Sequence, residues 1–290
     1  MSVTVDPALA YIVHFQQNSG LTSQRPLMRY QSRRILIEAG GLAVVLALLG
    51  ACATTTRTVL VPSADSKDCV VLMHGLNRSY RAMTKMARGL QEAGFSTANV
   101  DYPSQSGPIE ELAPRVVEEG LDKCRNTNAE QIHFVTHSIA GILLRYAHNE
   151  SPIPDLGRVV MLAPPNRGSE LVDKTRHWPG AELISGKAGL QLGTDAQSIP
   201  AQLGPVDFEL GVVAGTGTMS FFSAMLTDPD DGKLSIAETE VEGMDDFLVV
   251  KKSHHYIMTS DKVIENTKAF LLTGKFPDSM AATSSILSTQ

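Results

Sequence analysis

From residue 57 onward, short runs of apolar and β-branched residues alternate with longer stretches that are apolar on one side only. Such alternation is typical of α/β proteins with a mostly parallel sheet. Three of the runs, at 69–73, 132–136 and 158–162, are almost continuously apolar, as strands covered by helices on both faces are. The sequence therefore predicts an α/β fold with a mostly parallel central sheet and helices on both of its faces.

One domain accommodates all of these elements. Strands are expected at 58–61, 69–73, 97–101, 132–136, 158–162, 212–215 and 247–250, and helices at 79–93, 109–124, 140–149 and 261–272. Between 164 and 210 the periodicity weakens and Gly and Pro accumulate, which is typical of a binding loop or small lid above a sheet. The domain is expected over residues 67–276, followed by a Ser-, Thr- and Ala-rich disordered tail over 277–290.

The first 51 residues combine a basic segment with an apolar one. Arg29, Arg33 and Arg34 precede the uncharged stretch 39–51. A bilayer-spanning helix needs about 20 apolar residues, whereas a basic segment before a shorter apolar one is typical of a signal peptide. Residues 1–51 are therefore interpreted as an N-terminal extension and signal peptide, with Met28 as the expected true start.

The segment ends in LGAC, residues 49–52, which resembles the lipobox of bacterial lipoproteins. In that motif, small residues precede a cysteine that is lipidated and becomes the new N-terminus. The resemblance implies a lipid anchor on Cys52, a tether with the first strand over 52–66, and a membrane-anchored lipoprotein in the cell envelope that faces the periplasm or the exterior. An uncleaved membrane helix is the alternative, and both place the domain outside the cytoplasm.

Two cysteines remain, Cys69 and Cys124. Export to an oxidising compartment makes such a pair a disulfide candidate. Cys69 begins a predicted strand and Cys124 ends a predicted helix that leads into another strand, so both are expected at the same edge of the sheet. The interpretation is a disulfide, and two buried free thiols are the alternative.

The segment 132–141, IHFVTHSIAG, places Ser138 between a predicted strand and a predicted helix. It resembles the nucleophile elbow of the α/β-hydrolases, GxSxG, and its GHSxGG form in lipases. The elbow needs small residues two before and two after the serine, because the backbones are crowded there. Thr136 and Ala140 occupy these positions, so both glycines of the strict motif are missing. The resemblance implies Ser138 as nucleophile, and a serine that caps a helix is the alternative.

His74, Gly75 and Leu76 follow the predicted strand 69–73 and match the HG element after the third strand in lipases and esterases. That element supplies one of the two backbone N–H groups that stabilise the oxyanion, and the residue after the nucleophile supplies the other. The resemblance implies an oxyanion hole of Leu76 and Ile139. His74 is expected to order this loop rather than to act as a base.

A nucleophilic serine needs a histidine base, and in this fold the histidine comes last in the chain order Ser, Asp, His. The segment 253–256, SHHY, follows the last predicted strand and resembles the SHTF-like segment of bacterial lipase-like hydrolases. The resemblance implies His254 as the base. His255 is the alternative.

The base in turn needs a carboxylate that orients it. The segment 231–234, DGKL, resembles the NDGxV element of lipases and precedes His254 at a spacing close to theirs. The resemblance implies Asp231 as the acid, with Asp230 as the second choice. A solvated acidic turn and a calcium site are the other interpretations of the cluster 228–232.

A further element, LAPPNRGSE at 162–170, strongly resembles the LAPPNxGSE element of the same family and is expected to form a wall of the pocket. Together, these elements imply a bacterial lipase/esterase-like serine hydrolase over roughly residues 68–275. It would cleave carboxylic esters through an acyl-enzyme, without a metal or organic cofactor. A thioesterase, amidase or acyltransferase with the same residues is one alternative, and an inactive hydrolase-like envelope protein that binds lipid or protein is another.

The net charge of -6 disfavours a nucleic-acid partner, which would require a basic face. The expected partners are a small-molecule or lipid ester as substrate and a membrane held through the lipid anchor.

Overall fold

The computed structural model describes residues 55–64, 67–217, 221–227 and 229–279. All of them belong to one unit of the chain, Ala51–Gln290. The other unit, Met1–Gly50, lies outside the described residues, and so do the predicted start at Met28 and the predicted lipidation site Cys52. None of the helices in the described part is long and apolar enough to cross a membrane.

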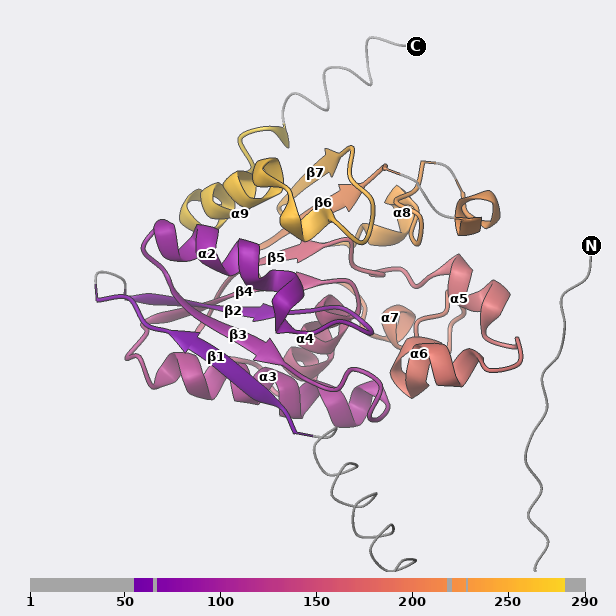
Figure 1. Cartoon of the computed structure of the whole chain (residues 1–290), viewed down its shortest axis with the longest axis horizontal. Helices are drawn as coiled ribbons and strands as arrows, with labels where there is room; N and C mark the ends of the chain where they lie inside the picture. Colours follow the sequence, from indigo (N-terminus) through magenta and orange to yellow (C-terminus); the bar gives the residue numbers. More distant parts are fainter. Residues whose placement is uncertain (1–54, 65–66, 218–220, 228, 280–290) are drawn as a thin grey trace, which may run out of the picture. The chain divides into compact units, whose positions relative to one another are not determined.

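Seven strands form one sheet in the order β1-β3-β2-β4-β5-β6-β7 (Figure 1). All neighbours are parallel except β1, which pairs antiparallel with β3. The strands are β1 (Arg57–Val61), β2 (Asp68–Met73), β3 (Ser96–Asp101), β4 (Gln131–His137), β5 (Leu156–Leu162), β6 (Leu210–Gly215) and β7 (Asp246–Val250). The predicted α/β class with a mostly parallel sheet is confirmed.

Helices cover both faces of the sheet, because alternate side chains of a strand point to opposite faces. In β2, Val71 and Met73 belong to one core cluster and Val70 and Leu72 to the other. The first cluster contains the buried faces of α3 and α4, and the second contains those of α2 and α9 (Figure 1). These helices are α2 (Thr84–Glu92), α3 (Ile109–Arg125), α4 (Ile139–Glu150) and α9 (Asp261–Thr273), and the short 3-10 helix η1 (Tyr80–Met83) precedes α2.

The segment between β5 and β6 is folded as short helices, which the sequence analysis treated as a loop or lid. They are α5 (Glu170–Thr175), α6 (Ala181–Leu190) and α7 (Ile199–Gln202). Further short elements after β6 are η2 (Phe221–Met225), α8 (Ile236–Thr239) and η3 (Ile257–Thr259). On α6, Leu183 and Ile184 are 85% and 68% exposed, whereas Ala188 near its end is buried in the core.

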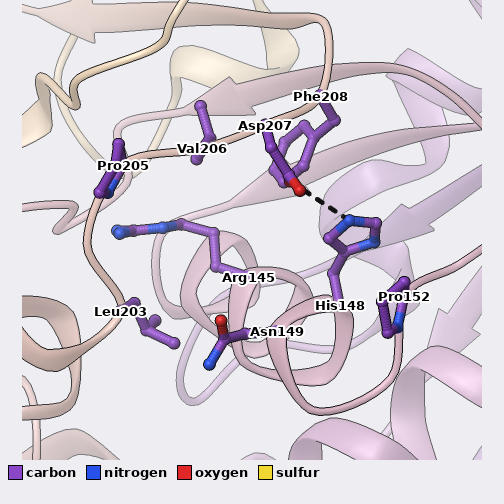
Figure 2. Close-up of a pocket in the computed structure, with 9 residues that line it drawn as sticks. All are labelled: Arg145, His148, Asn149, Pro152, Leu203, Pro205, Val206, Asp207 and Phe208. Atoms are coloured by element: carbon purple, nitrogen blue, oxygen red, sulfur yellow. Dashed lines mark ion pairs between the residues drawn. The ribbon is translucent and has the colours of Figure 1, made fainter.

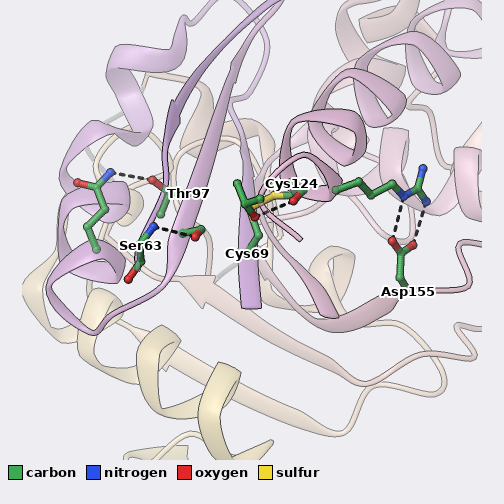
Figure 3. Close-up of a disulfide and its surroundings, with 9 residues drawn as sticks. Ser63, Cys69, Thr97, Cys124 and Asp155 are labelled. Carbon is green, nitrogen blue, oxygen red and sulfur yellow. Dashed lines mark hydrogen bonds and ion pairs between the residues drawn. A yellow bond between two sulfur atoms is a disulfide. The ribbon is translucent and has the colours of Figure 1, made fainter. Parts of the chain in front are cut away.

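Cys69, at the start of β2, and Cys124, in the last turn of α3, form a disulfide (Figure 3). Both residues are fully buried. Next to the bond, Arg125 donates two hydrogen bonds of 2.9 Å to the carboxylate of Asp155, which precedes β5. Parallel strands all start at one edge of the sheet and end at the other. The disulfide and the ion pair both lie at the edge where the strands start.

Candidate active site

Ser138 lies in a sharp turn between the end of β4 and the start of α4. Its φ is 58°, a value that glycine adopts easily and a residue with a Cβ does not. A hydrogen bond of 2.9 Å from its backbone N–H to the carbonyl of Leu162 helps to hold this conformation. A non-glycine residue in such a region costs about 1–3 kcal/mol and persists only where its surroundings hold it there.

The crowding around this turn is relieved by two glycines that the strict GxSxG motif does not include. A Cβ on Gly75 would lie 2.7 Å from His137 Nδ1 and 3.1 Å from the Cβ of Ser138, so the loop after β2 packs directly on the turn. A Cβ on Gly141 would lie 3.3 Å from Oγ1 of Thr136. Thr136 is larger than the glycine of the motif, and Gly141, which has no side chain, leaves room for it.

The structure brings Ser138, His254 and Asp231 into one hydrogen-bonded chain. The Nε2 of His254 lies 3.0 Å from Ser138 Oγ, and its Nδ1 lies 2.8 Å from Asp231 Oδ2. A carboxylate only accepts, so Nδ1 carries the proton and Nε2 is left to accept the hydroxyl proton of Ser138. Because Asp231 and His254 are only 1% and 3% exposed, water does not compete for this chain.

Backbone groups fix the carboxylate of Asp231. Its Oδ1 accepts hydrogen bonds from the N–H groups of Lys233 and Leu234, at 2.9 and 2.8 Å. Its own carbonyl accepts the N–H of His254 at 2.9 Å, so acid and base are also tied through the main chain. Asp231 is therefore held with Oδ2 toward the imidazole.

Asp230 and His255, the alternative acid and base, have other hydrogen-bond partners than Ser138, His254 and Asp231. Asp230 accepts hydrogen bonds from Ser223 and from the N–H of Gly232. The ring of His255 accepts a hydrogen bond of 2.7 Å from Arg78 at Nδ1. Burial, together with the charges of Lys233 and Arg78, lowers the pKa of His255 to about 4. In the described part of the chain, which includes Asp230 and Asp231 but not Asp228, no group of three His, Cys, Asp or Glu side chains is arranged to hold a metal ion.

Solved structures share this arrangement of strands and helices. The mature lipase BlEst2 of Bacillus licheniformis is 18% identical, with a TM-score of 0.58 over 76% of this chain and 98% of that one. A lipase-esterase related protein of Clostridium acetobutylicum is 13% identical, with a TM-score of 0.52 over 75% and 100% of the two chains. A bacterial membrane phospholipase A is 14% identical, with a TM-score of 0.52 over 86% and 99%. The chain has the α/β-hydrolase fold. No protein-family model and no curated protein sequence matches it.

In the α/β-hydrolase fold the oxyanion donors come from the residue after the nucleophile and from the loop after a neighbouring strand. Ile139 begins α4, so its N–H has no acceptor within the helix. The N–H of Leu76 makes no backbone hydrogen bond among the described residues. Both residues line the same cavity as Ser138.

His74 orders the loop that carries Leu76. Its Nδ1 lies 2.9 Å from the carbonyl of Gly75, and its Nε2 accepts the N–H of Tyr102. Its ring stacks on that of Tyr102 at 4.3 Å, and the Tyr102 hydroxyl donates to the carbonyl of His74 at 2.6 Å. Burial lowers the pKa of His74, so the neutral ring stays in these contacts.

His137 donates a hydrogen bond to the backbone of the base, His254, a role that the sequence analysis did not assign to it. Its Nε2 lies 3.0 Å from the carbonyl oxygen of His254, which can only accept, so Nε2 carries the proton. Burial, followed by the neighbouring His254, holds the pKa of His137 well below its usual value. The HS pair of the elbow therefore supplies both the serine and a neutral donor to the backbone of the base.

The 162–170 element is tied to α4 through Arg145. The buried guanidinium donates to the carbonyl and to Oδ1 of Asn166, both at 3.1 Å, and to the carbonyl of Gly204 at 2.6 Å. Arg145 also lines a cavity of about 270 Å³ with His148 and Asp207, whose side chains are 3.3 Å apart (Figure 2). Ser138 does not line this cavity, which lies toward the far end of α4.

The cavity beside Ser138 has a volume of about 110 Å³ and a largely apolar wall. That wall is formed by Leu76, Ile139, Leu171, Val172, Leu192 and Leu234. Two of these residues come from α5, so the segment between β5 and β6 supplies part of the pocket. Lys233 also lines the cavity, and the sequence analysis did not identify it.

Proposed function

We propose that this protein is a serine hydrolase that cleaves carboxylic esters, of the lipase or carboxylesterase type. The observation that carries the proposal is the hydrogen-bonded chain from Ser138 through His254 to Asp231, with Ser138 held in a strained turn. A serine that only capped a helix would need neither the turn nor the buried imidazole and carboxylate behind it. The lipases and esterases among the structurally similar proteins support the same activity.

In the proposed mechanism, Nε2 of His254 takes the proton of Ser138 as Oγ attacks the ester carbonyl. The N–H groups of Leu76 and Ile139 stabilise the resulting oxyanion. His254 then gives its proton to the alcohol oxygen, the alcohol leaves, and an acyl group remains on Ser138. A water molecule, deprotonated by His254, hydrolyses this ester and returns the serine.

We further propose that the protein works at a membrane, held there by a lipid on Cys52. The lipobox-like sequence before Cys52 supports this, and so does the buried disulfide, because such bonds form and persist in oxidising compartments. Metabolic labelling of the full chain with a radioactive fatty acid tests it. Label should be incorporated by the wild type and not by Cys52→Ser.

Hydrolysis of p-nitrophenyl esters of increasing acyl length tests the activity, with the full chain in a nonionic detergent beside Ser138→Ala. We expect the variant to lose about a thousandfold or more in kcat/KM. A fluorophosphonate probe should label the wild type and not the variant. If the wild type neither hydrolyses any ester nor takes the label, the proposed activity is wrong.

A further inference from the structure

Lys233 is a cation in the candidate active site whose side chain forms no hydrogen bond or ion pair with another described residue. It lines the cavity together with Ser138 and His254. Its side chain is half-buried, yet it makes no hydrogen bond or ion pair within the described residues. A lysine removed from water without a partner is unfavourable, so such a group is a candidate for contact with a ligand.

Arg78 brings a second positive charge next to the base from another part of the chain. It lies in the loop after β2, outside the lining of the Ser138 cavity, and donates a hydrogen bond of 2.7 Å to Nδ1 of His255, the neighbour of the base. Lys233 lines the cavity beside His254, so the two cations approach the base from two different loops. Among the described residues, Arg78 forms no ion pair with a carboxylate.

The carboxylate beside these two cations does not neutralise both of them. Asp231 attracts Lys233, but its oxygens are already bound by His254 and by two backbone N–H groups. The three nearby histidines, His137, His254 and His255, add no negative charge. Lys233 and Arg78 therefore place two positive charges beside the base, in a chain with 31 acidic and 25 basic residues.

The two cations lie close to the base, which would protonate the alcohol as it leaves. In the proposed mechanism His254 hands its proton to the alcohol oxygen, so the alcohol must be next to His254. Lys233 lies two residues after Asp231, the partner of His254, and Arg78 contacts the adjacent His255. The apolar wall with Leu171 and Leu192 is left for the acyl group.

We propose that the alcohol part of the substrate carries a phosphate group, which Lys233 and Arg78 bind while the acyl group occupies the apolar cavity. This rests on the proposed ester hydrolase activity and names its substrate class: acyl esters of phosphorylated alcohols such as glycerol phosphate. A phosphate carries between one and two negative charges near neutral pH, so its charge balances two cations better than the single charge of a carboxylate would. An arginine and a lysine together are suited to its oxygens.

Two soluble substrates that differ only in the phosphate test this. We would compare kcat/KM for hexanoylglycerol and hexanoylglycerol phosphate, using the full chain in a nonionic detergent. We expect the phosphorylated ester to be preferred by about tenfold or more, since charge-assisted hydrogen bonds are among the stronger ones. The preference should shrink as salt is added, because the cations are partly exposed.

Four variants connect the preference to the two side chains. We expect the ratio of the two kcat/KM values to move toward one in Lys233→Met and in Arg78→Met. Arg78→Lys keeps the charge and should retain most of the preference for the phosphorylated ester. Lys187→Met removes the same charge from an exposed position on α6 that does not line this cavity, and should leave the ratio unchanged.

The outcomes separate this inference from the proposed function. If both esters are hydrolysed equally well, or if Lys233→Met lowers both rates by the same factor, Lys233 acts on Asp231 and the inference is wrong, while the ester hydrolase proposal stands. If neither ester is hydrolysed and the fluorophosphonate does not label Ser138, the proposed function fails, and the inference fails with it.

Discussion

The two edges of the sheet are built in opposite ways. Where the strands start, a disulfide joins β2 to α3, and Arg125 binds Asp155 through two hydrogen bonds. Where the strands end, Ser138 is held at a positive φ and buried polar atoms of Thr136, His137 and Asp230 have no hydrogen-bond partner in the described chain. The first edge is linked by a disulfide and an ion pair, whereas the second holds the strained nucleophile turn and several buried polar atoms that are individually unfavourable.

This difference indicates a division of roles within one fold. Unfavourable conformations survive only where the rest of the structure supplies the stability that they lack. In this protein the links at the opposite edge and the two apolar cores provide that support. Changes at the strained edge should therefore affect activity, and changes at the linked edge should affect the free energy of unfolding.

The largest effect is expected for Ser138→Gly. Loss of the hydroxyl should lower kcat/KM by about a thousandfold or more. Because glycine adopts a φ of 58° without strain, the free energy of unfolding should rise by about 1 kcal/mol. Ester hydrolysis and urea unfolding measure the two changes. Ser138→Ala is the matched control, since it loses the same activity but keeps a Cβ and should gain no stability.

Removal of the disulfide should have the reverse pattern. The bond closes a loop with a sequence separation of 55, and the double change Cys69→Ala with Cys124→Ala should lower the free energy of unfolding by about 2–4 kcal/mol. At temperatures well below unfolding, kcat/KM should stay within about twofold of the wild type. A parallel loss of activity under those conditions would contradict the division between the edges.

Gly75→Ala should disturb the strained edge by crowding it. The added Cβ would lie 2.7 Å from His137 Nδ1 and 3.1 Å from the Cβ of Ser138. Displacement of catalytic groups by even part of an ångström lowers rates strongly, and we expect kcat/KM to fall about a hundredfold. Gly89→Ala is the steric control, because its Cβ would lie 2.5 Å from Ile264, in the core that α2 and α9 form with the sheet. It should lower stability and leave kcat/KM of the folded protein unchanged.

Much of this architecture could be predicted because its signals are local. The seven strands and the long helices were found from apolar runs and helical periodicity, which buried strands and amphipathic helices impose on a sequence. Helices α5, α6 and α7 were missed because four to ten residues hold too few turns to show a period. Their positions depend on contacts with other parts of the chain, such as the hydrogen bond from Asn77 to the carbonyl of Ile184.

The residues of the candidate site likewise divide into those with a local signal in the sequence and those without one. Ser138, Asp231 and His254 could be named because each follows a strand within a recognisable element, and the structure brings the three together. Arg78 and Lys233 could not, because their positions near the base require two loops that are far apart in the sequence to meet there. Cys52 lies outside the described residues, and its lipidation stays a prediction.

The smallest effect is expected for Asp155→Asn at the linked edge. Hydrogen bonds from Arg125 hold the pKa of Asp155 below its usual value, so the carboxylate adds stability above its unfolded pKa of about 4. That stability is lost as the pH falls through the lowered pKa. Because both side chains are partly exposed to water, at 38% and 26%, the variant should lose only about 0.5–1 kcal/mol at neutral pH.

Urea unfolding of the wild type and Asp155→Asn at neutral pH, pH 5 and pH 3 measures this dependence. The difference between them should narrow toward the lowest pH, where the wild-type carboxylate also takes up a proton. Glu130→Gln removes the charge from the more exposed pair with Lys67 and should change stability less at every pH. A difference that stayed constant with pH would mean that Asp155 acts through packing rather than charge. The linked edge would then owe its stability to the disulfide, the core and the packing of Asp155, and the charge of the ion pair would add nothing to it.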